Sequence, residues 1–209
     1  MIGSVASNPH QARLQIEERL ASLPLTFLPN RYSHWEFAAF PNMAAIYSNL
    51  ARTCIVPEQD VFAGAVAAQM DQIENDEVIA RAYRTYPALV RQHHFSLVLK
   101  EHFPLVVRSE QLDLDGVDIL VVEGGRAYGI ALSVETSAAH AWQSVKEKRH
   151  PQSPETLPVL FLYARRTDFC VGRFWLHYPD QWLEVRRWID DYRLQDDWYS
   201  AQLFRQVIP

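Results

Sequence analysis

The spacing of hydrophobic and polar positions in the first hundred residues is typical of helices. Residues 9–23 set Leu14, Ile16 and Leu20 among charged side chains, and residues 57–75 begin with proline and acidic residues, as a helix N-terminus prefers. Further helices are expected from Pro41 and over residues 76–103, where Pro87 predicts an interruption or a kink. We therefore expect a helical N-terminal part.

After residue 103 the pattern changes to short apolar runs. These predict strands over residues 104–110, 116–122 and 126–134, the last two joined by a Gly-Gly turn at 124–125. A helix over 137–150, strands over 158–166 and 169–178, and a helix over 179–194 should follow. Alternating elements of this kind predict an α/β fold with a mixed sheet covered on both faces. We expect a helical part over 1–86 and an α/β core over 87–209, together forming one compact unit.

Composition narrows the class of protein. The chain is 48% hydrophobic and 12% aromatic, enough to bury a sizeable core, and no apolar run approaches the roughly 18 to 20 residues of a membrane span. A cytoplasmic protein without membrane contact is the expectation. The two cysteines, Cys54 and Cys170, form no CxxC pattern. The net charge of −5 argues against coating nucleic acid by charge alone.

One hairpin carries the candidate chemistry. Asp118 opens the second predicted strand, and the sequence "YGIALSVET" forms the third. With the order helix, strand, strand, strand, helix, strand, residues 87–163 resemble the core of the PD-(D/E)xK, or restriction-endonuclease-like, nuclease superfamily. The resemblance implies that an aspartate on the second strand and an E-x-K on the third hold Mg²⁺ or Mn²⁺. Asp118 fits the aspartate position, but Ala131 stands at the glutamate position and Ser133 at the lysine position.

Two interpretations of the hairpin follow from these replacements. In the first, the site is degenerate, no cofactor is bound, and the fold persists as a non-cleaving nucleic-acid-associated or assembly component. In the second, the site has migrated: Asp118 and Glu135 hold Mg²⁺ or Mn²⁺, and Lys146 supplies the charge beside the phosphate of DNA or RNA. Glu101 is the acid available on the helix before the first strand, where some family members place a metal-binding glutamate. Asp118 could also be a simple turn residue.

Two other groups of residues suggest partners. Lys146, Lys148 and Arg149 form a basic cluster suited to contacts with DNA or RNA phosphates. Trp182, Trp188 and Trp198 either pack the last helix onto the sheet or anchor a protein partner. The third hypothesis is therefore a pure protein-interaction module, such as an assembly subunit or an inhibitor.

Overall fold

The computed structural model describes residues 8–28, 41–70, 75–108, 117–134, 157–164 and 169–207; at residue 75 and over 195–207 the description covers the backbone. Four helices form the N-terminal part: α1 (Pro9–Ser22), α2 (Met43–Ala51), α3 (Gln59–Ala67) and α4 (Asn75–His102). The side chains of Asn8 and Asn42 accept hydrogen bonds from the first turns of α1 and α2 and so cap them. Helices form in each of the expected regions, although α3 ends at Ala67, short of the end expected at residue 75.

Helix α4 is the centre of the molecule, and the predicted interruption at Pro87 does not end it. A proline inside a helix removes one backbone hydrogen bond. The neighbouring residues Tyr86 and Leu89 are buried in the core, and their packing holds the helix together across the gap. Helix α4 crosses the predicted boundary between residues 86 and 87. The division of the chain into a helical part over 1–86 and a core over 87–209 stays a prediction.

The sheet has four strands in the order β1 (Leu105–Val107), β2 (Ile119–Glu123), β3 (Arg126–Val134) and β4 (Val159–Ala164). Strands β1, β2 and β3 are antiparallel neighbours, whereas β3 and β4 are parallel. Gly124 and Gly125 form the predicted turn, with φ angles of 59° and 76° that favour glycine. The predicted α/β fold with a mixed sheet is confirmed at this level.

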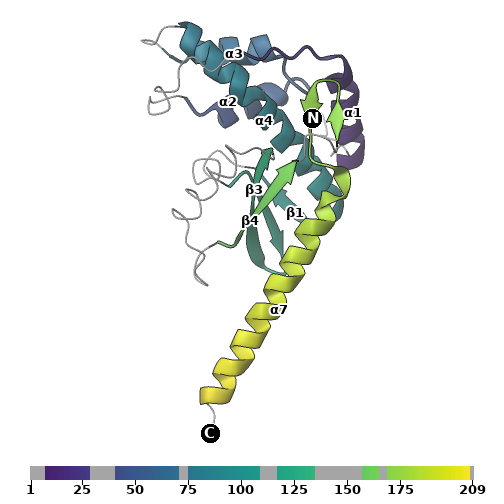
Figure 1. Ribbon diagram of the computed structural model, residues 1–209, viewed down its shortest axis with the longest axis vertical. Coiled ribbons are helices and arrows are strands. Elements are labelled where there is room, and N and C mark those ends of the chain that lie inside the picture. The colour runs from purple at the N-terminus through teal and green to yellow at the C-terminus, as the bar shows by residue number, and fades with distance from the viewer. Residues whose placement is uncertain are drawn as a thin grey trace, which may run out of the picture.

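Two hydrophobic clusters share α4. One fills the space between the N-terminal helices and includes Ile16, Leu20, Tyr47, Phe62, Tyr86 and Phe174. The other lies between α4, the sheet and the last helix, α7 (Trp182–Val207), and includes Phe95, Leu99, Ile119, Tyr128, Ile130 and Ile189. Figure 1 shows α4 and α7 lying along the same side of the sheet. The helix predicted over 137–150 lies outside the described residues, and the predicted cover of both faces of the sheet stays a prediction.

Residues 169–178 differ from the prediction of a single strand. They form a two-stranded antiparallel hairpin, β5 (Cys170–Val171) and β6 (Phe174–Trp175), which turns at Gly172 with φ of 58°. A Cβ atom at Gly172 would lie 2.4 Å from the carbonyl oxygen of Leu20, so the turn sits directly against α1. The glycine therefore serves both a left-handed turn and a close approach of two backbones.

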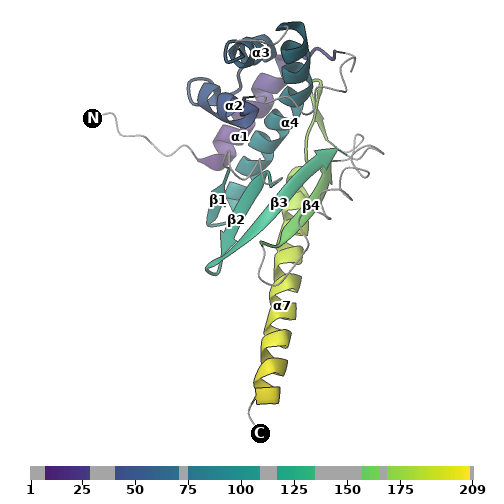
Figure 2. The same ribbon diagram turned by 90° about the vertical axis from the view of Figure 1, so that its left-hand side faces the viewer.

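The last helix is longer than the predicted segment 179–194. A 3-10 helix, η2 (Pro179–Gln181), leads into α7, whose second half extends beyond the sheet in both views (Figures 1 and 2). Over the part of the chain that the structure describes, no helix combines the length and apolar character needed to cross a membrane.

Candidate functional site

Asp118 lies immediately before β2 and joins three elements. Its backbone N–H donates to the carbonyl of Ile130 on β3, at 2.9 Å. Its side-chain Oδ1 accepts a hydrogen bond of 2.6 Å from Nε2 of Gln92 on α4, and Oδ2 accepts from the backbone N–H of Leu132 on β3. Both carboxylate oxygens therefore accept N–H groups of the protein itself, which is a structural use of the acid.

The charge next to Asp118 is the guanidinium of Arg91, which is 7% exposed. Its Nε donates to the carbonyl oxygen of Trp175 on β6, at 2.9 Å. Burial lowers the pKa of Arg91 to about 10, while the negative charge of Asp118 acts in the opposite direction. Arg91 is thus still a cation at neutral pH, and Asp118 is its nearby counter-charge.

The third strand offers no acid beside Asp118 within the described residues. Side chains alternate along a strand, so Gly129, Ala131 and Ser133 share one face of β3. Ala131 is buried, and a Cβ atom at Gly129 would lie 3.1–3.2 Å from side-chain atoms of Val159, Leu157 and Val117. This part of the face is closely packed with apolar groups and contains neither the glutamate nor the lysine of an E-x-K.

The described residues give Asp118 no companion ligands for a divalent cation. No group of three or more His, Cys, Asp or Glu side chains that could hold a metal occurs in the described ranges. Glu135 and Lys146, the other members of the predicted migrated site, lie outside the described residues, as do Lys148 and Arg149. The migrated site and the basic cluster therefore stay predictions.

Four consecutive polar residues of α4 connect the helix to its neighbours. Arg91 bonds to β6 and Gln92 to Asp118, as described above. His93 Nδ1 lies 3.3 Å from the hydroxyl of Tyr47 on α2, and His94 Nε2 lies 2.8 Å from Glu17 on α1. The sequence carried a signal for these four contacts, because the polar run "RQHH" interrupts the apolar segments "PALV" and "FSLVL" in the middle of a helix. Arg91 and Gln92 were nevertheless not among the functional residues expected from the sequence.

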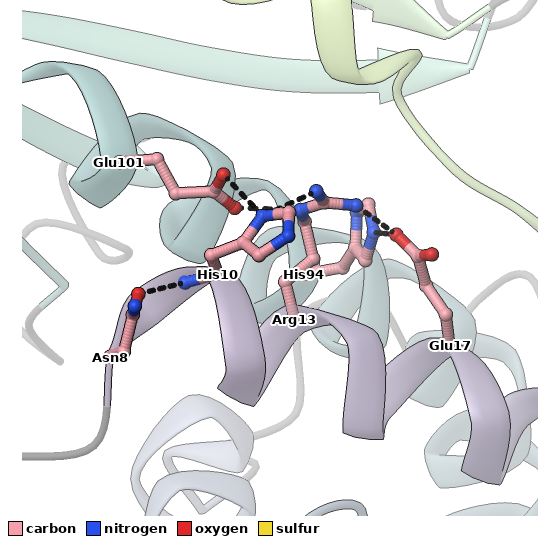
Figure 3. A network of polar contacts seen from close by, with 6 residues as sticks. All are labelled: Asn8, His10, Arg13, Glu17, His94 and Glu101. Atoms are coloured by element: carbon pink, nitrogen blue, oxygen red, sulfur yellow. Dashed lines mark hydrogen bonds and ion pairs between the residues drawn. The ribbon is translucent and has the colours of Figure 1, made fainter.

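Glu101 belongs to a polar network between α1 and α4 (Figure 3). Glu101 accepts from Nε of Arg13 at 2.7 Å and pairs with His10 at 2.9 Å, and Arg13 also bonds to Glu17. Burial raises the pKa of Glu101, but the bonds from Arg13 and His10 outweigh it, and the pKa lies below its usual value. Glu101 therefore connects α1 to α4, and a role for it beside a metal stays a prediction.

The two described tryptophans of α7 pack against the second core cluster. The Trp182 ring stacks on the His102 ring with centroids 3.9 Å apart, and Trp188 meets Tyr128 edge to face at 6.0 Å. Both are half-buried, so they fix the base of α7 to the sheet and to α4. The side chain of Trp198 is outside the description. Whether any of the three anchors a partner stays a prediction.

Comparisons with models of protein families, with curated proteins and with solved structures found no match to this chain. The resemblance to nucleases thus rests on the order of elements and on the position of Asp118 alone. The chemistry of the site has to be argued from its own contacts.

Proposed function

We propose that this chain is a nuclease-like α/β protein that associates with nucleic acid, or with an assembly that handles it, without cleaving it. The observation that carries the proposal is the binding of both Asp118 oxygens by Gln92 and the N–H of Leu132. In a degenerate site the acid that once held a metal is free to take a structural role. The strand order β1-β2-β3-β4, with only β3 and β4 parallel, agrees with the element order on which the resemblance rests.

The competing activity is that of a metal-dependent DNA or RNA endonuclease with Asp118, Glu135 and Lys146 as its site. A divalent cation needs several oxygen ligands, and within the described part of the chain no group of three or more His, Cys, Asp or Glu side chains that could hold one occurs. The non-cleaving proposal is favoured for that reason.

The test is a combined cleavage and binding experiment on single- and double-stranded DNA and RNA, with Mg²⁺ and then Mn²⁺. We expect binding that weakens with salt and no cleavage by the wild-type protein. Replacing Lys146, Lys148 and Arg149 together with alanine should weaken binding and reduce its salt dependence, because three phosphate contacts would be lost. Cleavage that disappears in a folded Asp118→Ala variant would establish the nuclease instead.

A pure protein-interaction module is the second candidate, and helix α7 favours it. In Figures 1 and 2 the second half of α7 extends beyond the sheet, and Leu194 is 67% exposed. A helix that leaves the body of a protein is a common way to reach a partner. If this is the main role, the protein should bind no nucleic acid at low salt, and Leu194→Asp should abolish self-association or partner binding measured by light scattering.

A further inference from the structure

A pocket of about 400 Å³ lies between α4, the end of β3 and strand β6. Its lining combines aromatic and cationic side chains, namely Phe27, Tyr83, Arg84, Arg91 and Trp175, with Val134 at the last position of β3. Since Arg91 is also the cation beside Asp118, the pocket adjoins the hairpin on which the nuclease resemblance rests. Its volume is in the range of small-ligand sites.

The aromatic part of the pocket is accessible to solvent. Phe27 is 58% exposed, and its ring lies 6.5 Å from that of Trp175 at an interplanar angle of 30°. The guanidinium of Arg173, in the turn between β5 and β6, lies 5.8 Å from the centre of the Phe27 ring. An exposed phenylalanine beside a tryptophan and an arginine forms a platform on which a flat group can stack.

The charge of the pocket is positive. Arg84 and Arg91 line it, and Arg173 lies at its edge over Phe27. Among the described residues, two acids adjoin the lining and have partners: Asp118 accepts from Gln92 and Leu132, and Asp60 accepts from the hydroxyl of Tyr83. Because Asp118 balances the charge of Arg91, Arg84 and Arg173 are the cations beside the aromatic platform, and they complement a ligand that is both flat and anionic.

We infer that this pocket binds a nucleotide of a single-stranded nucleic acid, with the base stacked on Phe27 and the adjoining phosphate near Arg84 and Arg173. The inference rests on the proposed association with nucleic acid and names the part of the surface that makes the contact. It differs from the basic cluster Lys146, Lys148 and Arg149 in offering a ring for a base as well as charge for a phosphate.

The experiment uses fluorescence anisotropy of a labelled single strand of about ten nucleotides, titrated with the full chain over a range of salt concentrations. Phe27→Ala should weaken binding by about 5- to 150-fold and leave the salt dependence unchanged, because it removes stacking and no charge. Arg173→Gln should weaken binding and reduce the slope of log affinity against log salt by about 0.7, the value for one lost phosphate contact on a single strand.

Two control variants match these changes elsewhere on the surface. Tyr178→Ala removes an aromatic side chain that is 45% exposed and lies outside the pocket lining. Arg187→Gln removes one positive charge from an exposed position on α7. Both should bind the strand as the wild type does, and all four variants should keep the wild-type melting temperature.

The possible outcomes distinguish failure of the pocket inference from failure of the proposed function. If the wild type binds the strand and Phe27→Ala and Arg173→Gln bind it equally well, the pocket inference is overturned and the proposed function stands. If the wild type does not bind the single strand even at low salt, the inference is overturned; the proposed function fails with it only if the protein also binds no double-stranded DNA or RNA and no assembly. A free mononucleotide that competes at concentrations similar to those of the strand would identify a free nucleotide as the ligand and overturn the inference.

Discussion

Replacing Asp118 with alanine should destabilise the fold. The change removes the acceptor for Gln92 Nε2 and for the N–H of Leu132, two hydrogen bonds to a charged group. Such bonds contribute about 1.5 to 3 kcal/mol each, and because Asp118 is half-buried we take the lower value for both. We therefore expect the free energy of unfolding to fall by about 3 kcal/mol, to which the loss of the counter-charge to Arg91 adds.

The assay is urea unfolding followed by circular dichroism. For a protein of this size a loss of about 3 kcal/mol moves the urea midpoint down by roughly 1 to 2 M. Asp118→Asn should cost about half as much, because an amide can accept one of the two bonds but presents N–H groups to the other donor. Asp190→Ala, at an exposed position on α7, is the matched control and should leave the midpoint unchanged.

A double-mutant cycle with Gln92→Ala tests the contact itself. The two substitutions remove the same bond, so the double variant should be less destabilised than the sum of the single variants by about 1 kcal/mol or more. Additive effects would show that the two side chains do not interact in solution. An Asp118→Ala protein as stable as the wild type would refute the structural role of this acid.

Three further predictions concern the fold around the site. Burial lowers the pKa of His177 and of His93 to about 3. As the pH falls, these histidines therefore bind protons in the unfolded chain before they do so in the folded protein. Thermal melts should show full stability above about pH 6.5 and a decline below it, and His177→Phe should make that decline smaller. A pH-independent melting temperature between pH 7 and 5 would contradict this. Gly172→Ala should lower the free energy of unfolding by about 2 kcal/mol or more in chemical denaturation, because φ at Gly172 is positive and a Cβ there would meet the Leu20 carbonyl. Gly64→Ala is the control: its Cβ would lie in open space, and it should stabilise α3 by about 0.5 to 1 kcal/mol. Equal effects of the two variants would rule out strain at Gly172. Trp188→Ala should cost about 2 to 3 kcal/mol in the isolated chain, since the ring packs on Tyr128, and an unchanged stability would mean that the ring serves a partner instead.

The elements with strong local signals were predictable from sequence. The β2–β3 hairpin follows from two apolar runs and a Gly-Gly turn, which need no other part of the chain to define them. Two other predictions depended on contacts that the local sequence does not show: Pro87 does not end α4, and residues 169–178 form a hairpin instead of one strand. The helix continues through Pro87 because its neighbours are buried in the core, and the hairpin turns at Gly172 because α1 lies against it. Both outcomes depend on tertiary contacts.

The site was predictable only in part. The position of Asp118 at the start of β2 could be predicted, since the strand pattern places it there. Its partner Gln92 lies 26 residues earlier in the chain, and periodicity cannot pair an amide on a helix with an acid before a strand. The pocket likewise combines residues from α4, β3 and β6 with the segment that follows α1, so no local motif announces it.

The most direct test of the central claim, that Asp118 is a structural acid in a protein that does not cleave, is a calorimetric titration of the wild-type chain with Mn²⁺ beside Asp118→Asn. We predict no saturable binding in either protein at up to millimolar Mn²⁺. A stoichiometric site in the wild type that is lost in the folded Asp118→Asn variant would show that the acid holds a metal, and would contradict the claim in favour of the migrated nuclease site.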